Sequence, residues 1–282
     1  MILEYSVIES NLNCSLPIII SIPHSGTNYD KVFLKNILLS KDELQYSEDS
    51  YVDELLITPI KNDISYVKAL FPRSYVDVNR HPLELDPLII STDIPNFIKS
   101  TSAKVQNGIG VIPRVSVYGN EIYNNLLTRK NIVNRLLNNY FPYHKTLKNL
   151  IKNIKNKYTN ILILDFHSMP SKSIINKDID IVLGNNYNSS SSEYITDKVK
   201  EYFKLLNYSI ELNYPYSGGY ITENYGKPES GINVLQIEIN RSIYMDENTL
   251  LRNKNKMKLL SNNLDSLVRY LNIQLITNNN FN

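Results

Sequence analysis

Two histidines of this chain directly follow apolar runs, a position from which an imidazole can ligate a metal. His24 comes after the apolar residues 16–22, and His167 ends the run that begins at Ile161. Asp165 lies two residues before His167, so both side chains point to the same face of a strand. A carboxylate beside an imidazole fixes the orientation of that ring for metal binding or catalysis. The chain has only four histidines, and the recurrence of this arrangement predicts a metal site.

A third apolar run carries a carboxylate at its centre. Glu238 lies between Ile237 and Ile239 in residues 234–241, whose alternation is typical of a strand. Burying an ionised carboxylate is costly unless it is paired or binds a cation. Glu238 is therefore expected either to act at the same site as the histidines or to face solvent from an edge strand.

The residue types favour a catalytic zinc, which typically has three protein ligands and an open position for water. His24 and His167 are the first two candidates. A helix expected at about 48–57 offers Asp49 as the third ligand, with Asp53, four residues later on the same face, and Glu54 as alternatives. These acids could instead serve only to stabilise the amino terminus of that helix.

Arginines and glycines in three loops are candidates for substrate binding, because a guanidinium group pairs well with a carboxylate and glycine lets the backbone approach a ligand. The candidates are Arg73, Asn79, Arg80, Arg114, Gly218 and Gly219. Surface ion pairs, Arg73 with Asp77 or Arg80 with Glu84, are the alternative. His81 is expected in a loop, and His144 is expected to be a structural histidine at the start of a helix.

Length and composition limit the class of protein. The chain has 282 residues, 42% of them hydrophobic, and a net charge of +2 without a basic stripe, which argues against a nucleic-acid partner. The apolar run at 16–22 is far too short to cross a membrane, and no secretory signal precedes it. The single cysteine, Cys14, fits a reducing compartment. We therefore expect a cytoplasmic protein with no membrane partner.

Strand-like and helical patterns alternate along the chain, which predicts an α/β sheet covered on both faces. Strands are expected at about 16–22, 64–71, 161–166, 179–183, 208–212 and 233–239. Helices are expected at about 30–39, 48–57, 119–139, 141–157, 191–206 and 246–272. Residues 80–118 read as a long functional loop. Ligand sites in such sheets gather at the carboxyl ends of strands.

Six ordered blocks of residues together resemble the N-formylglutamate amidohydrolase family, over about residues 15–270. The blocks are Pro23-His24-Ser25-Gly26, Asp49-x-x-Val52-Asp53-x-Leu55, Arg73-x-x-x-Asp77-x-Asn79-Arg80, Asp165-Phe166-His167-Ser168-Met169-Pro170, Tyr216-Ser217-Gly218-Gly219 and Gln236-Ile237-Glu238-Ile239-Asn240-Arg241.

That family is similar in fold to the zinc carboxypeptidases and aspartoacylases. The resemblance implies one domain over residues 1–282, a three-layer α/β/α fold of the phosphorylase/hydrolase-like kind, with a mixed, largely parallel sheet and one zinc ion at its carboxyl edge. It also implies that Asn79-Arg80 binds a carboxylate and that Glu238 is the general base. Thr27 stands where the carboxypeptidases have a glutamate ligand, so the third ligand must come from elsewhere.

The expected activity is zinc-dependent hydrolysis of the formamide of a small, anionic N-formyl amino acid, with N-formyl-L-glutamate as the leading candidate. Arg80 and Asn79 would hold the α-carboxylate, and Arg114 or Arg73 the second carboxylate or the developing oxyanion. The alternatives are a zinc carboxypeptidase, a deacylase for another acyl group, and a non-catalytic protein that binds a small anion.

Overall fold

The computed structural model describes residues 8–12, 15–57, 64–91, 98, 101–173 and 178–277. Cys14, part of the 80–118 loop and the asparagine-rich end lie outside these ranges. The chain divides into two compact units, each built from separate stretches of sequence. Unit 1 comprises residues 1–9, 23–50 and 68–146, and unit 2 comprises residues 10–22, 51–67 and 147–282. That both belong to a single domain stays a prediction.

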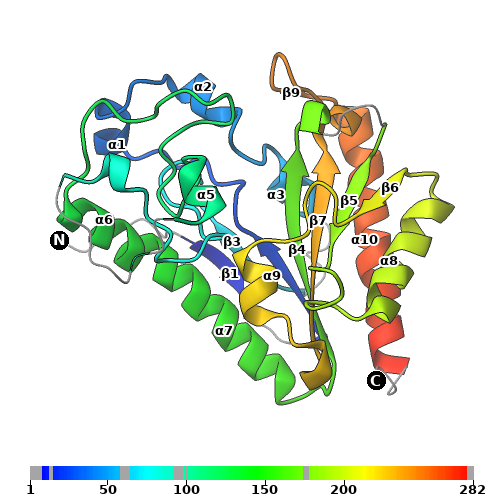
Figure 1. Cartoon of the computed structure of the whole chain (residues 1–282). Coiled ribbons are helices and arrows are strands. Elements are labelled where there is room, and N and C mark those ends of the chain that lie inside the picture. Colours follow the sequence, from blue (N-terminus) through cyan, green and yellow to red (C-terminus); the bar gives the residue numbers. More distant parts are fainter. Residues whose placement is uncertain are drawn as a thin grey trace. The chain divides into compact units, whose positions relative to one another are not determined.

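A mixed seven-stranded sheet has the order β1-β3-β2-β4-β7-β5-β6 (Figure 1). Its strands are β1 (Ile8–Asn11), β2 (Ile18–Ile22), β3 (Ser65–Ala69), β4 (Ile161–Met169), β5 (Ile181–Gly184), β6 (Ile210–Leu212) and β7 (Ile232–Asn240). The neighbours β2, β4 and β7 are parallel, and β5 is antiparallel to β7 but parallel to β6. The predicted α/β class, with a mixed and largely parallel sheet flanked by helices, is confirmed.

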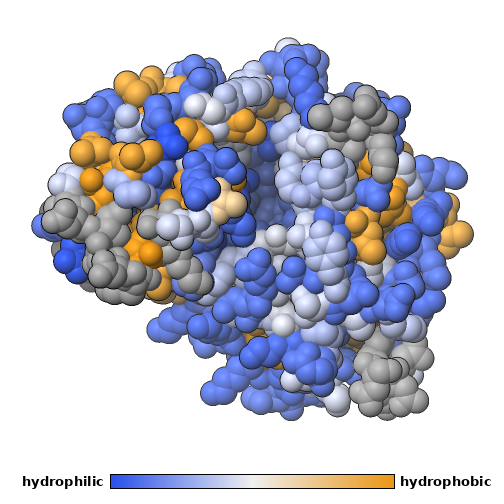
Figure 2. Space-filling model, viewed as in Figure 1, coloured by the Kyte–Doolittle hydropathy of each residue, from blue (hydrophilic) through white to orange (hydrophobic). Residues whose placement is uncertain are grey.

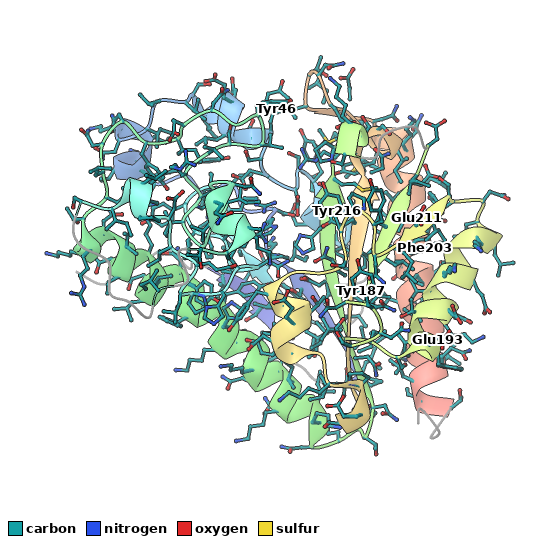
Figure 3. The ribbon with its side chains drawn as sticks, in the orientation of Figure 1. Tyr46, Tyr187, Glu193, Phe203, Glu211 and Tyr216 are labelled. Carbon is teal, nitrogen blue, oxygen red and sulfur yellow. The ribbon has the colours of Figure 1, made fainter. Side chains whose placement is uncertain are left out.

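One face of the sheet in unit 2 packs against three helices, α3 (Val52–Leu55), α8 (Glu193–Leu205) and α10 (Lys254–Thr277). Alternate residues of the central strands, such as Leu164 and Ile237, are fully buried in this cluster. Phe203 of α8 belongs to the same cluster (Figure 3). Complete burial of each such side chain contributes roughly 1.5–3 kcal/mol to stability, so this face anchors the sheet.

The opposite face of the same strands carries polar side chains. Because side chains alternate along a strand, the residues between the apolar ones of β2, β4 and β7 share this second face. They include Ser21, Asp165, His167, Gln236 and Glu238, all of them buried. The sheet therefore presents three neighbouring strands with hydrogen-bonding and titratable groups on one side and an apolar core on the other.

Unit 1 consists mainly of short helices and loops. Its helices are α1 (Lys31–Lys35), α2 (Lys41–Gln45), α5 (Ala103–Gln106) and α6 (Arg129–Arg135), the last continuing through a π-helical turn, Leu136–Tyr140, into α7 (Phe141–Lys155), which enters unit 2 at residue 147. Side chains of Asp30, Ser40 and Thr128 cap α1, α2 and α6 by accepting hydrogen bonds from backbone N–H groups. These caps explain why such short helices begin where they do.

Several expected helices differ from the structure. The helix expected at 48–57 does not begin until α3 at Val52, because Tyr51 has a left-handed backbone with φ of 65° and ends any helix that precedes it. The helix expected from residue 119 begins at Arg129. The helix expected from residue 246 begins at Lys254, after a hairpin of β8 (Met245–Asp246) and β9 (Leu251–Arg252). The sequence did not predict β1, α2 or α9 (Tyr220–Tyr225).

The surface shown in Figure 2 is mostly hydrophilic, with hydrophobic side chains in small groups. Among the described residues, no helix combines the length and the hydropathy needed to span a lipid bilayer.

Candidate active site

His24 follows β2 and is held by a buried carboxylate. Its Nε2 lies 2.7 Å from Oδ1 of Asp77, and the side chains of both residues are almost fully buried. The other oxygen, Oδ2, accepts a hydrogen bond of 2.8 Å from Nη2 of Arg73. Burial alone would raise the pKa of Asp77, but the charges of His24, Arg73 and Arg80 outweigh it and hold that pKa well below its usual range. Asp77 is therefore an anion that orients the ring of His24.

The other ring nitrogen of His24 faces Asp49. Nδ1 lies 3.4 Å from Oδ2 of Asp49, which is 1% exposed. The backbone N–H of Asp49 donates to the carbonyl of His24 at 3.0 Å, and the hydroxyl of Ser25 donates to the carbonyl of Asp49 at 3.0 Å. A Cβ on Gly26 would lie 2.2 Å from the carbonyl oxygen of Phe71, so only glycine fits there. The Pro-His-Ser-Gly block thus fixes Asp49 beside the imidazole. The expectation that Asp49 sits on a helix with Asp53 is wrong.

His167 has the same type of support within unit 2. Its Nε2 lies 3.0 Å from Oδ2 of Asp165, whose Oδ1 accepts a hydrogen bond of 2.6 Å from the hydroxyl of Ser21. The register of the parallel strands places Ser21 directly beside Asp165. In both histidines a carboxylate engages Nε2, so that Nδ1 is the ring nitrogen that can ligate a metal.

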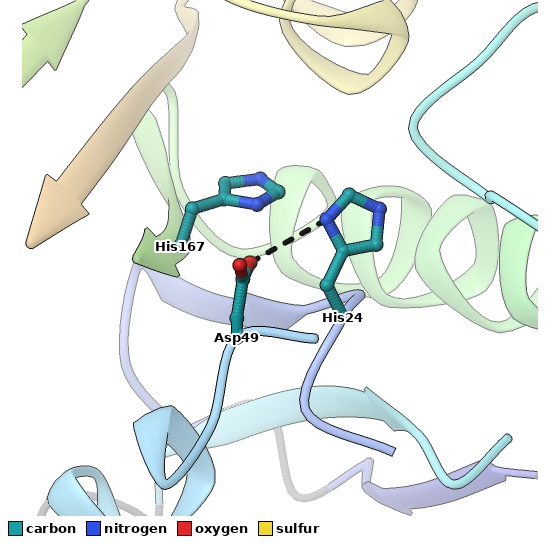
Figure 4. Close-up of side chains that lie close together, drawn as sticks. All are labelled: His24, Asp49 and His167. Atoms are coloured by element: carbon teal, nitrogen blue, oxygen red, sulfur yellow. Dashed lines mark ion pairs between the residues drawn. The ribbon is translucent and has the colours of Figure 1, made fainter. Parts of the chain in front are cut away.

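His24, Asp49 and His167 each offer a ligand atom, and these three atoms lie within 4.8 Å of one another (Figure 4). All three residues are buried. Two imidazole nitrogens and one carboxylate oxygen are a typical donor set of a catalytic zinc, so the residues fit a divalent metal. Asp53 and Glu54 are not part of this group, and Glu54 forms an ion pair with Arg252.

Glu238 lies next to His167 across two parallel strands, since the two residues are register partners. Its side chain is 7% exposed, and Nε2 of Gln236 donates a hydrogen bond of 3.0 Å to Oε1. Because β7 lies between β4 and β5 in the sheet, Glu238 is not on an edge strand, and the solvent-facing alternative is excluded. Its position suits a base beside the candidate metal ligands.

The three candidate arginines differ in how far their charge is compensated. Arg114 pairs with two carboxylates, those of Asp86 and Glu121, and Arg73 pairs with Asp77. The Arg73 ion pair was an alternative expected at the surface, but its carboxylate is buried. The Arg80 guanidinium donates instead to two carbonyl oxygens, Nε to Ile109 at 2.9 Å and Nη1 to Asn79 at 3.0 Å.

Backbone carbonyls orient the Arg80 guanidinium but do not neutralise it. Among the described residues no carboxylate forms an ion pair with Arg80, although its charge acts on Asp77. Glu84, the partner considered from the sequence, accepts from the backbone of His81 instead. Arg80 is thus the candidate whose charge is best suited to a substrate carboxylate. Its neighbour Asn79 is buried, and the backbone N–H of Asn79 donates a hydrogen bond to Oδ1 of Asp77.

The Gly218-Gly219 loop belongs to unit 2, and its backbone requires glycine at position 218. Gly218 has φ of 141°, and a Cβ there would lie 2.3 Å from Oγ1 of Thr222. That hydroxyl donates to the carbonyl of Gly219 at 2.7 Å, at the start of α9. Tyr216, labelled in Figure 3, precedes the loop and donates to Oγ of Ser173 at 2.9 Å. A substrate contact by the two glycines stays a prediction.

The remaining two histidines, His81 and His144, are not part of the candidate metal group. Nδ1 of His81 accepts from the backbone of Leu83 within a turn. His144 is buried, with Nε2 2.9 Å from the carbonyl oxygen of Val78 and its ring 4.4 Å from that of Tyr140. The sequence did not single out Glu48, which is buried and accepts hydrogen bonds from the backbone of Arg73 and the hydroxyl of Ser74. The one feature of the sequence that could have drawn attention to Glu48 is its position directly before the candidate ligand Asp49.

A comparison with known families gives a match over most of the chain. The sequence model of the N-formylglutamate amidohydrolase family matches residues 16–245. The chain belongs to this family.

Individual relatives agree with this family membership. The chain is 25% identical to an N-formylglutamate deformylase of Pseudomonas aeruginosa over 238 residues, 82% of this chain and 83% of that protein. It is 24% identical to a deformylase of the same name from Pseudomonas putida over 241 residues, again 82% and 83% of the two chains.

Among solved structures, the N-formylglutamate amidohydrolase of Ralstonia eutropha superimposes with a TM-score of 0.86 at 28% identity, covering 92% of this chain and 94% of that one. A gene product of Agrobacterium tumefaciens shares the fold, with a TM-score of 0.68 at 14% identity and 95% coverage of both chains.

Proposed function

We propose that this member of the N-formylglutamate amidohydrolase family hydrolyses N-formyl-L-glutamate to formate and L-glutamate, with zinc held by His24, Asp49 and His167. The buried group of two imidazoles and one carboxylate carries the proposal. Relatives named N-formylglutamate deformylase, which match more than four fifths of the chain, support the substrate.

When bound, a divalent metal would supply Lewis-acid chemistry, polarising the formyl oxygen and making a water molecule more acidic. The chain's own residues prepare the ligands for it. Asp77 and Asp165 keep a proton on Nε2 of His24 and His167 and orient both rings through hydrogen bonds to that nitrogen. This selects the tautomer whose Nδ1 carries a lone pair.

Glu238 is the proposed general base. It takes a proton from the attacking water and returns it to the nitrogen of the leaving glutamate, which must be protonated to depart as an amine. The amide of Gln236 holds one carboxylate oxygen at 3.0 Å, which limits the rotation of the group.

Arg80 is the proposed clamp for the α-carboxylate of the substrate. Its guanidinium is held at two nitrogens by backbone carbonyls, so little side-chain entropy remains to be lost when a carboxylate binds. Asn79 precedes it and supplies an amide in the same turn. Arg73 and Arg114 are committed to carboxylates of the chain and are weaker candidates for this role.

The test combines metal analysis with a hydrolysis assay. Purified protein should bind about one zinc ion and release formate from N-formyl-L-glutamate, whereas His24→Ala and His167→Ala should lose both the metal and the activity while remaining folded. His81→Ala is the matched control, because His81 accepts a hydrogen bond within a turn and is not part of the candidate metal group, and it should keep the metal. Full metal content in either ligand variant contradicts the metal site. If the zinc-loaded protein hydrolyses only other N-acyl amino acids, the proposal that N-formyl-L-glutamate is the substrate is wrong.

A further inference from the structure

Arg135, near the end of α6, is a buried cation that the proposed reaction does not use. It is 3% exposed. Its Cζ lies 4.2 Å from the ring centroid of Tyr75, 5.2 Å from that of Tyr123 and 5.4 Å from that of Phe33. Nη1 donates to the carbonyl of Tyr75 at 2.9 Å and to the hydroxyl of Tyr123 at 2.7 Å. Within the described part of the chain, no carboxylate forms an ion pair with this guanidinium.

Aromatic rings stabilise a cation only in part, and burial of a charge without a counter-ion is among the larger costs in a folded protein. Arg135 also buries Nε without a hydrogen-bond acceptor. One turn earlier on α6, Asn131 buries Oδ1 without a donor. An N–H donor and a carbonyl acceptor, four residues apart and therefore on one face of the helix, are thus both left without partners.

Arg135 and Asn131 line the same pocket in unit 1. The pocket has a volume of about 190 Å³. Its buried wall includes Phe33 and Arg135, and its lining also includes the exposed residues Val32 and Leu126. It shares no lining residue with the candidate active site. A few water molecules would fill this space and could form hydrogen bonds with Nε of Arg135 and Oδ1 of Asn131, but they would not neutralise the guanidinium.

Asp30 lines the same pocket from the amino terminus of α1. Burial raises the pKa of the Tyr75 hydroxyl, and the charges of Arg135 and Asp30 act on that pKa in opposite directions, so both charges lie close to one ring. The exposed carboxylate of Asp30 disfavours a simple anion in this space. It favours a ligand that also carries a positive group.

We infer that this pocket binds a free α-amino acid, with the ligand carboxylate at Arg135 and its ammonium group at Asn131 and Asp30. The acceptor oxygens of the carboxylate complement the N–H of Arg135, and the N–H groups of the ammonium complement Oδ1 of Asn131. The apolar side chains of Val32 and Leu126 leave room for a small side chain. This pocket is separate from the proposed active site, although L-glutamate, the proposed product of the reaction, is itself an α-amino acid.

The chain contains no tryptophan, which allows a reporter that senses this pocket alone. Leu126→Trp places a single indole among the lining residues, at a position that is 58% exposed. Titration with L-alanine and with L-glutamate should give a saturable change in its emission. Propionate and ethylamine each lack one of the two charges of alanine and should bind at least roughly ten-fold more weakly. A second reporter, Leu205→Trp on α8, 82% exposed, should show no change.

Variants then test the named contacts. Asn131→Leu in the Leu126→Trp background should weaken the binding of L-alanine by roughly ten-fold or more, and Arg80→Ala should leave it unaltered, which separates this pocket from the proposed active site. Calorimetry on the protein without the added tryptophan should show the same loss with Asn131→Leu. No saturable signal up to about 50 mM amino acid, weaker than the ordinary range of specific sites, overturns the inference. So does a signal that Asn131→Leu leaves intact.

Discussion

The carboxylate of Asp77 joins the imidazole of His24 to the guanidinium of Arg73, at 2.7 Å from Nε2 and 2.8 Å from Nη2. Asp165 holds His167 at 3.0 Å in a similar way. Each histidine of the candidate metal site is therefore oriented by a buried carboxylate within its own unit, before any metal binds. A preorganised ring loses less conformational entropy on ligation, which links these two acids to metal affinity.

Asp77→Asn should weaken zinc binding by roughly 10- to 100-fold, the usual effect of losing a carboxylate behind a metal-binding histidine. The amide keeps the shape of the side chain but removes the charge that fixes the tautomer of His24. Competition with a calibrated chelator measures the change. Asp86→Asn is the matched control, since Asp86 is equally buried and also pairs with an arginine, Arg114. Equal losses of zinc affinity in both variants would assign the effect to general destabilisation.

Glu238→Gln should reduce kcat by roughly 10²- to 10⁴-fold with unchanged zinc content, because glutamine cannot accept the water proton. Steady-state kinetics and metal analysis on the same preparation check this prediction. The Gln236 side chain donates a hydrogen bond of 3.0 Å to Oε1 of Glu238 but has no part in the proposed proton transfer, so Gln236→Leu should produce a much smaller loss of kcat. A Glu238→Gln protein that has lost its metal would make Glu238 a ligand and not the base.

The ends of the apolar strands could be predicted from the sequence because an alternating or apolar run specifies both a strand and the face of each residue. His24, His167 and Glu238 were found in this way. Asp49 was named as a candidate ligand, and its carboxylate lies beside His24, but it precedes α3 and is not on the helix where it was expected. The left-handed backbone of Tyr51, at φ of 65°, is a tertiary feature that no local pattern signals.

Pairings between distant segments were the part that the sequence could not give. Asp77 was considered only as a surface partner of Arg73, since nothing in a linear pattern shows that residues 53 positions apart, such as His24 and Asp77, are in contact. The same limit applied to the arginines. The resemblance named Arg80 for the α-carboxylate, but the sequence did not show that carboxylates of the chain pair with Arg73 and Arg114.

Stability should depend on pH through Glu48. Burial is the main cause that raises the pKa of this carboxyl from 4.5 to about 8. The unfolded chain then releases the proton near pH 4.5 while the folded protein keeps it to about pH 8. The folded state binds more protons in this window, so the free energy of unfolding falls as pH rises through it, by about 1.4 kcal/mol per unit at most, and levels off above.

Glu48→Gln should flatten this slope, measured by urea unfolding of the metal-free protein at pH 5, 6, 7 and 8, values chosen within the roughly three-unit window. Glu43→Gln is the control, because the pKa of that exposed carboxyl is lowered by its hydrogen bonds to Ser40 and lies below the window. A slope that persists in Glu48→Gln would mean that another group dominates the titration.

Specificity for an α-carboxylate should depend on Arg80 and not on Arg114. Loss of a hydrogen bond between charged groups costs about 1.5–3 kcal/mol, so Arg80→Ala should lower kcat/KM for N-formyl-L-glutamate by roughly 10- to 100-fold, mainly through KM. Arg114→Ala should change it little, because two carboxylates of the chain already occupy that guanidinium. The corresponding N-formyl amino amide lacks the α-carboxylate and should be insensitive to Arg80→Ala. Equal losses on acid and amide would show that Arg80 acts on the formyl group or on the fold, and would return the search for the clamp to Arg73.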